Sequence, residues 1–420
     1  MERDRRTVLS TSAGMAVEFA ESHLTARAGV NEVPPSLGTE RSCEAARERR
    51  AESSDGRARR APRVAVLIPT YRRPAYLERC LRAVLHQTYR PHCIVVVVRE
   101  EDEESKAVVR RFHAEVHERG ATDVASPDLR PHPSESSRHF RGSGVEIQMV
   151  SVALPGPVWA FKRGIEALRA RADIDLVFVT DDDAAAEPEW IERGSRHFAD
   201  PTVGIVAGRL ISYRDGRPAI SPPVKRVGRL TWYGRYVGGF DRPGDTRGPM
   251  PVAGFQGSNA AIRRALLEHI DVDTRVIGYG MQFELDLALQ VRRLGYRILF
   301  DPECRVHHFE APRPVPEEAR EDLARLIYTY SHNHTYLMLK HLPLLRKLAF
   351  LLYFFVRGER RSLGLATLFW AMVCSPRSPW REAARVAFRG KWHGIRTYWR
   401  WRNIARNPER CCGRLPIMDS

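Results

Sequence analysis

The sequence predicts an α/β fold with a mostly parallel sheet, flanked by helices. Runs of apolar residues typical of buried strands alternate, between residues 64 and 300, with segments whose apolar residues recur at helical spacing. Such alternation favours a parallel sheet of doubly wound type. The chain has 420 residues, of which 43% are hydrophobic, so it is long enough to bury a sizeable core.

The first two predicted strands establish which edge of the sheet carries polar residues. VAVLIPT (64–70) is followed by a helical pattern over 71–88, and CIVVVVRE (93–100) by another over 105–120. The polar end of the first strand and the acidic end of the second then face the same edge. In open α/β sheets, that edge is the usual ligand crevice.

The remaining elements follow in the same alternation. We expect strands at 145–152, 176–180, 203–211 and 297–300, and helices at 158–170, from 188 onward, within 254–270 after a Gly-rich loop, and at 283–294. Residues 213–251 are rich in Gly, Pro and aromatic residues, and their pattern assigns no regular element.

A cluster of three carboxylates ends the strand LVFVTDDDA. Asp181, Asp182 and Asp183 follow five residues of apolar, strand-forming sequence. Like charges this close repel unless a cation or hydrogen-bond donors offset them. Oxygen ligands of this kind suit Mg²⁺ or Mn²⁺. The alternative is a solvated turn or helix cap, where Asp is also favoured.

Composition divides the chain into three parts. Residues 1–61 are Arg-, Glu- and Ser-rich without apolar periodicity, so we expect a disordered tail. The α/β domain is expected at 62–312, with a surface insertion at 121–143, and a basic helical region at 313–420. The seven cysteines are scattered without a CxxC pair, and the N-terminus does not resemble a secretory signal, which favours a reduced, cytoplasmic setting.

The C-terminal region carries most of the net charge of +16, because residues 341–420 hold 16 Lys and Arg against 4 Asp and Glu. Its apolar runs are too short to span a bilayer. Residues 380–402 place Phe388, Trp392, Ile395 and Trp399 at helical spacing beside a row of arginines, although Gly390 and Gly394 disfavour a helix. This pattern fits an anionic membrane surface or packing on its own domain; nucleic acid is less favoured because no nucleic-acid-binding fold is recognisable.

The order of these motifs resembles the inverting nucleotide-sugar glycosyltransferases of family 2, which have the GT-A fold. The resemblance covers residues 63–310 and rests on seven pieces in the family's order. They are VAVLIPTYRRPAYLERCLRAVLHQ, the strand ending in Arg99 and acidic residues, GPVWAFKRGIEAL, FVTDDDAAAEPEWIE, VGIVAGRL, GFQGSNAAIRR and FELDLALQVRRLGYRILFDPECRVHH.

The resemblance implies roles for the polar residues at the sheet edge. Asp181 and Asp183 match the metal-binding Asp-X-Asp motif, with Asp182 between them on the donor side, and His308 matches a histidine that sometimes ligates the metal. On the donor side, the nucleotide-binding candidates are Thr70, Tyr71, either Glu100 or Asp102, and Lys162 as a phosphate contact.

The resemblance also places a general base on the helix that begins near Phe283. The family motif is Glu-Asp followed two residues later by Asp, whereas this chain has Phe283, Glu284 and Asp286, so Glu284 occupies the base position. Gly257, Asn259 and Asp286 match the acceptor side. Helix capping explains Asn259 equally well, and a dipole-favoured first turn explains the two acidic residues.

These motifs together predict a metal-dependent, inverting glycosyltransferase. The expected cofactor is Mn²⁺ or Mg²⁺, the donor a UDP-, GDP- or dTDP-sugar, and the acceptor a glycan or lipid-linked hydroxyl. We expect a cytoplasmic protein, peripheral at the inner face of the cell membrane. The alternative is an inactive GT-A-like protein that binds a membrane surface or nucleic acid through its basic region.

Overall fold

The computed structural model describes residues 60–124, 144–214, 216–219, 221–311, 322–374 and 380–406. Nearly all of the expected disordered tail, 1–61, and most of the expected insertion, 121–143, lie outside the described residues. The described chain divides into a sheet unit, residues 60–230 and 236–311, and a helical unit, residues 231–235 and 322–406. The expected boundary at residue 312 falls within the segment that the structure leaves undescribed.

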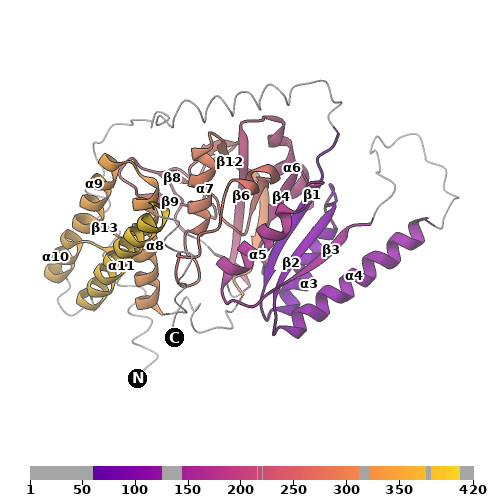
Figure 1. Ribbon diagram of the computed structural model, residues 1–420, viewed down its shortest axis with the longest axis horizontal. Helices are drawn as coiled ribbons and strands as arrows, with labels where there is room; N and C mark the ends of the chain where they lie inside the picture. Colours follow the sequence, from indigo (N-terminus) through magenta and orange to yellow (C-terminus); the bar gives the residue numbers. More distant parts are fainter. Residues whose placement is uncertain are drawn as a thin grey trace. The chain divides into compact units, whose positions relative to one another are not determined.

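A ten-stranded sheet forms the centre of the sheet unit (Figure 1). Its order is β10-β12-β6-β11-β4-β1-β2-β3, with β5 paired to β12 and β7 to β6. The strands are β1 (Val64–Thr70), β2 (Cys93–Arg99), β3 (Glu146–Val152), β4 (Leu176–Val179), β5 (Ala184–Ala186), β6 (Val203–Arg214), β7 (Arg217–Pro218), β10 (Met250–Val252), β11 (Ala260–Arg263) and β12 (Arg297–His308). The pairs β1–β2, β1–β4, β2–β3 and β6–β12 are parallel, which confirms the predicted type of sheet.

The helices of the sheet unit connect these strands and cover the sheet. They are α3 (Pro74–Leu85), α4 (Glu103–Val124), α5 (Pro157–Arg169), α6 (Trp190–Arg196) and α7 (Phe283–Arg293). From β1 to β3 the chain moves outward through α3 and α4, and α5 then returns it to β4 on the other side of β1. Because crossovers are right-handed, this reversal puts α5 on the face opposite α3 and α4. The crevice expected at such a reversal lies at the carboxyl ends of β1 and β4.

One predicted helix is wrong. Residues 254–270 contain the antiparallel strand β11 and then the 3₁₀ turn η2 (Arg264–Glu268) instead of a loop and an α-helix. β11 pairs with β4 on one side and β6 on the other, and Ala260, Ala261 and Ile262 are buried. The hydrogen bonds and burial available between two strands outweigh the helix propensity of alanine, which is a weak preference.

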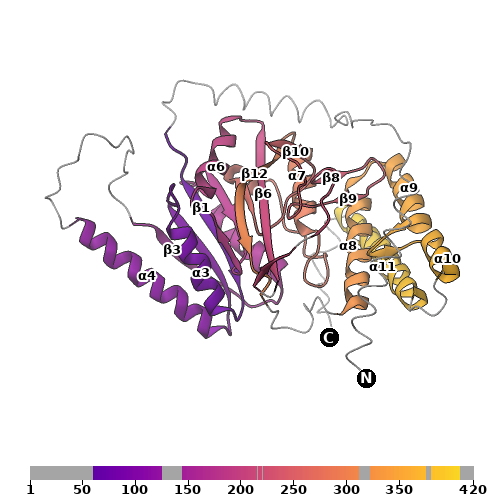
Figure 2. The same ribbon diagram turned by 180° about the vertical axis from the view of Figure 1, so that it is seen from behind.

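The helical unit is built around two long helices that pack together, α8 (Leu323–His341) and α11 (Trp380–Arg406). Between them the chain forms α9 (Leu344–Leu352), the π-helical turn η4 (Tyr353–Arg357), the hairpin β13 (Gly358–Glu359) and β14 (Ser362–Leu363), and α10 (Leu365–Cys374). Figure 2 shows these helices from behind. Among the described residues, no helix combines the length and the apolar character needed to cross a bilayer.

Two glycines let α11 approach α8 closely. A Cβ on Gly390 would lie 2.6 Å from the carbonyl oxygen of Tyr328, and one on Gly394 would lie 2.5 Å from that of His332. α11 therefore continues unbroken through both positions, which the sequence pattern disfavoured. Most of its buried residues are small, whereas Trp392 and Trp399, expected on one apolar face with Phe388 and Ile395, are 60% and 50% exposed.

A buried lysine joins α11 to the turn between α9 and α10. The ammonium group of Lys391 donates to the carbonyl oxygens of Phe354 and Leu363, at 2.5 and 2.8 Å. It also lies over the ring of Phe354, 4.4 Å from the centroid. Burial lowers the pKa of Lys391 to about 7. The lysine thus anchors η4 and β14, from which α9 and α10 extend.

We expect Gly394→Ala to destabilise the protein by about 1–3 kcal/mol, because the added methyl group collides with backbone that cannot move aside cheaply. This loss should appear although Ala favours a helix interior by about 1 kcal/mol over Gly. Urea or thermal unfolding measures it. The matched control is Gly248→Ala, where an added Cβ meets no atom within 4 Å. Equal stability of the two variants would contradict the close packing of α8 and α11.

Candidate functional site

The ends of β1 and β4 bring the predicted polar residues together at the crevice edge. Thr70 is the last residue of β1, and the three aspartates begin two residues after β4. Parallel pairing of the two strands places these ends side by side. The hydroxyl of Thr70 donates to the carboxylate of Asp182 at 2.8 Å, and both residues are buried. Thr70 therefore supports the aspartate cluster directly.

A short strand after the aspartates positions His308. The sequence did not predict β5, which pairs with the end of β12 so that Ala184 lies opposite His308. Because successive side chains of a strand point to opposite faces, only one of the two adjacent histidines can face the aspartates. His308 Nε2 lies 3.2 Å from Asp183 Oδ1 and 3.8 Å from Asp181 Oδ2.

The neighbouring His307 turns the other way, 3.1 Å from the hydroxyl of Tyr213. Of the two adjacent histidines, His308 is the one that faces the aspartates. Ligand atoms of Asp181, Asp183 and His308 all lie within 4.8 Å of one another.

This group fits a divalent cation. Carboxylate oxygen with one imidazole nitrogen is a donor set that suits Mn²⁺ and also accommodates Mg²⁺ through its oxygens. Asp183 Oδ2 accepts the backbone N–H of Ala311 at 2.9 Å, while Oδ1 is buried and faces His308. The buried Oδ1 is therefore the carboxylate oxygen placed to meet a cation beside His308.

An arginine that the sequence analysis missed lies between two of the aspartates. Arg73 Nη1 is 3.0 Å from Asp182 Oδ1 and 3.3 Å from Asp183 Oδ2, and its side chain is only 16% exposed. Its other nitrogen, Nη2, reaches the carbonyl oxygen of Ala311 at 3.4 Å. The position of Arg73 immediately before the first residue of α3, in YRRP, was the available signal. It was not distinguishable from a helix-flanking surface arginine.

The aspartates differ in their electrostatic surroundings. Burial raises the pKa of Asp182, although the charge of Arg73 opposes the shift. Burial acts in the same direction on Asp183, but the hydrogen bond and charge of His308, with the charge of Arg73, outweigh it and hold the pKa of Asp183 below its usual value. Asp183 is therefore the buried carboxylate best held in its charged form.

Glu284 lies in the first turn of α7, next to the Gly-rich loop. The backbone N–H of Gly257 is 3.4 Å from Glu284 Oε1, and a Cβ on Gly257 would lie 3.2 Å from the same oxygen. Burial raises the pKa of Glu284 to about 7, and the charge of Asp181 adds to this shift. A carboxyl group that gains and releases its proton near neutral pH suits a general base.

Two residues expected on the acceptor side face into the protein. Asn259 is 1% exposed, and its side chain accepts from Trp190 Nε1 and donates to the carbonyl oxygens of Arg209 and Cys304, each at 2.9 Å. Asp286 is also 1% exposed and accepts from Gln290 at 2.8 Å. Residues two apart on a helix point in different directions, so Asp286 does not share the face of Glu284.

At the second strand, the structure distinguishes the two acidic candidates. Asp102 is buried, accepts the backbone N–H of Arg72 at 2.5 Å and that of Ser105 at 3.1 Å, and so joins the loop after β1 to the start of α4. Glu100 is exposed. The ring of Tyr71 lies beside the guanidinium groups of Arg72 and Arg99, 5.1 and 5.2 Å from its centroid. Asp102 and Tyr71 thus border the same loop.

Lys162 lies elsewhere on the sheet unit. Its ammonium group pairs with Asp271 at 3.1 Å, and both residues line a separate cavity with Arg169 and Gln290. The structure does not bring it to the aspartate cluster, so its predicted phosphate contact gains no geometric support.

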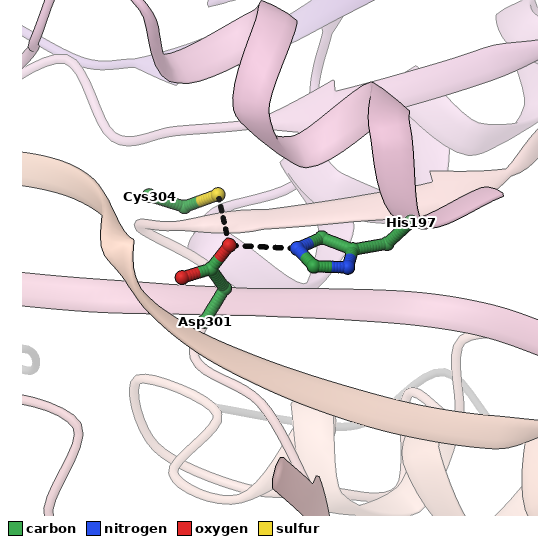
Figure 3. Close-up of side chains that lie close together, drawn as sticks. All are labelled: His197, Asp301 and Cys304. Atoms are coloured by element: carbon green, nitrogen blue, oxygen red, sulfur yellow. Dashed lines mark hydrogen bonds and ion pairs between the residues drawn. The ribbon is translucent and has the colours of Figure 1, made fainter. Parts of the chain in front are cut away.

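A second cluster of possible metal-binding side chains, His197, Asp301 and Cys304, lies at the bulge in β12 (Figure 3). Asp301 Oδ2 is 2.6 Å from His197 Nε2 and 3.6 Å from Cys304 Sγ, and Oδ1 accepts the backbone N–H of Glu303 at 2.8 Å. The adjoining cavity is lined by Arg193 and Arg196 together with Glu189, Glu192 and Glu303, with which the two arginines form ion pairs. These contacts explain Asp301 as the residue that fixes the bulge to η1 (His197–Ala199).

We expect Arg73→Met to lower the free energy of unfolding by about 3–5 kcal/mol near neutral pH, because two buried carboxylates lose their counter-charge. The pKa of Asp183 is depressed in the folded protein, so its contribution exists above its unfolded pKa of roughly 4 and fades as pH falls. The loss should therefore shrink in acid. Arg82→Met, which breaks the exposed pair with Glu78, is the control and should cost far less. Similar losses at neutral pH would contradict the assignment.

Two solved structures are similar to this chain at low sequence identity. The mannosyltransferase PcManGT from Pyrobaculum calidifontis, solved in complex with GDP-Man and Mn²⁺, has 17% identity and a TM-score of 0.47, over 92% of this chain and 99% of that one. Residues 1–349 of TarS from S. aureus have 12% identity and a TM-score of 0.43, over 85% and 94%. A comparison with curated proteins gave no match.

A family model covers more than half of the sequence. It matches residues 62–125 and 137–329, which include every strand of the large sheet. The match and the mostly parallel sheet with flanking helices agree with the GT-A fold that the sequence motifs implied. The chain therefore belongs to the family described as glycosyltransferase like family 2.

Proposed function

We propose that the protein transfers a sugar from a nucleotide-diphosphate donor to an acceptor hydroxyl with inversion at the anomeric carbon, and that it needs Mn²⁺ or Mg²⁺. One observation carries the proposal. A group of two carboxylates and a histidine suited to a divalent cation lies at the crevice edge, and the charge of one of its members, Asp181, acts on the carboxyl group of Glu284.

In this proposal Asp181, Asp183 and His308 hold the cation. When bound, the cation supplies positive charge that stabilises the departing diphosphate. The protein keeps the ligands in place without it, because Ala311 and Arg73 fix one oxygen of Asp183 and leave the other toward His308. His308 would hold the cation through Nε2 in its neutral form.

Glu284 takes the proton of the acceptor hydroxyl. Attack on the side opposite the leaving diphosphate inverts the anomeric carbon, and the attacking oxygen becomes a strong nucleophile as the carboxylate removes its proton. Burial of Glu284 favours proton uptake, and the N–H of Gly257 keeps one carboxylate oxygen oriented. The acceptor is expected beside Gly257, as a glycan or lipid-linked hydroxyl.

The donor nucleotide is expected along the loop that Thr70, Tyr71 and Asp102 border. Asp102 can accept from a base N–H, and Tyr71 offers an aromatic face. The geometry does not select among uracil, guanine and thymine, so thermal-shift measurements with UDP-, GDP- and dTDP-sugars and Mn²⁺ are the direct assay. The cytoplasmic location expected from the sequence stays a prediction.

Asp183→Asn and Glu284→Gln should separate donor binding from transfer. Asp183→Asn should weaken Mn²⁺-dependent donor binding, whereas Glu284→Gln should keep that binding and lose about 10²–10⁴-fold in kcat. Asp271→Asn, which changes an exposed Asp paired with Lys162, is the matched control and should leave both unchanged. NMR of the product should show an inverted anomeric configuration; retention would exclude the mechanism, and full activity of both variants would exclude the site.

The rate of transfer should rise as pH rises through about 7, because the pKa of Glu284 is raised to about 7 and only its deprotonated form accepts a proton. Below that pKa, kcat/KM should fall about tenfold per pH unit. A cation that offsets the charge of Asp181 would move this rise in rate to lower pH. A pH–rate profile of the wild type and of Glu284→Asp tests the assignment; an unshifted rise in the variant would count against Glu284.

A further inference from the structure

Exposed large apolar side chains are concentrated in the helical unit. Of the 17 among the described residues, only Met149, Leu154 and Leu294 belong to the sheet unit, where they are scattered along the sequence. The other 14 belong to the helical unit, which is the smaller of the two. Single exposed apolar residues need no explanation, but a concentration of this kind marks an interaction surface.

Two short helices carry most of this apolar surface as regular stripes. On α9, Leu344, Leu345, Leu348 and Leu352 are 58–75% exposed, while Phe350 on the opposite side is fully buried. On α10, three residues spaced four apart, Leu365, Phe369 and Val373, are 57%, 71% and 65% exposed. Both helices contact η4, the turn that Lys391 anchors. α9 therefore has an inner face that packs and an outer face that meets solvent, and the exposed row on α10 lies along one side of that helix.

The charge around these stripes selects the partner. The described residues of 322–406 include 15 Lys and Arg and only three acidic residues, Asp322, Glu359 and Glu382. Exposed Arg360 and Arg361 lie in the turn between α9 and α10, and α10 itself carries no charge. Apolar helix faces flanked by arginine match a surface whose interior is apolar and whose headgroups are anionic.

We propose that the apolar stripes of α9 and α10 dock the protein on an anionic lipid surface. α9 has nine residues and so is roughly 14 Å long, about half the hydrocarbon thickness of a bilayer. The helices therefore lie in the interface, with leucine and phenylalanine side chains among the acyl chains and Arg360 and Arg361 at the phosphates. This docking goes beyond the proposed reaction and does not depend on it.

The test is co-sedimentation of the full-length chain with phosphatidylcholine vesicles, with and without anionic phosphatidylglycerol. We expect binding to the anionic vesicles that weakens, without vanishing, as salt rises. Leu345→Gln with Leu352→Gln, and separately Phe369→Gln with Val373→Gln, should each lower the partition coefficient at least about tenfold. Gln keeps a helix-compatible side chain at these exposed positions, so folding should survive, as circular dichroism can confirm.

Leu154→Gln, which changes an exposed leucine of the sheet unit, is the matched control and should bind vesicles as the wild type does. Arg360→Gln with Arg361→Gln should reduce the preference for anionic vesicles. The proposal is overturned if the stripe variants bind as tightly as the control, or if the wild type binds neither kind of vesicle. A lipid-free dimer that the stripe variants dissociate, without vesicle binding, would assign the surface to a second copy instead.

Discussion

Three adjacent carboxylates at the end of a buried strand are the constraint on which the site depends. Asp182 and Asp183 are nearly inaccessible to water, so their charges must be offset by the protein itself. The chain does this with Thr70 at the end of β1 and Arg73 just after it, and with His308 at the end of β12 and Ala311 just after it. Every one of these partners depends on the sheet order, because only the pairing of β4 with β1 and of β5 with β12 brings them within reach.

The division of partners gives the aspartates different roles. Asp182 is fully engaged by Thr70 and Arg73 and acts as the support of the cluster. Asp183 lies between Arg73 and His308, since one of its oxygens accepts from Arg73 and the other faces His308. Asp181 is the most exposed of the three, with 41% of its side chain accessible, and so is the member that can meet a ligand. This gradient from buried to exposed explains why three acids occur where two would bind a metal.

The parts that the sequence predicted well are those set by local pattern. β1, β2 and β4 are continuous apolar runs, and the spacing in α3 and α5 fits one buried helix face, so short stretches suffice to identify them. The prediction for β11 failed because the alanines of this strand pack between two strands that are distant in sequence. β5 has only three residues and owes its existence to β12. In the site, the order of the motifs indicated the aspartates and Glu284. Identifying His308 required the register of its strand, and identifying Arg73 required tertiary contacts. The interior position of Asn259 follows from its contact with Trp190, which is distant in sequence.

The pairing of β5 with the end of β12 also sets when the cluster can exist. Its members come from residue 70, residues 181–183 and residue 308, so the loop that must close spans most of the sheet unit. Contacts between such distant parts require a long loop to close, which is costly in chain entropy and slow. A nascent chain emerging from the ribosome therefore cannot assemble this acidic centre until its last sheet strand has been synthesised, and incomplete chains never present the finished cluster to the cell.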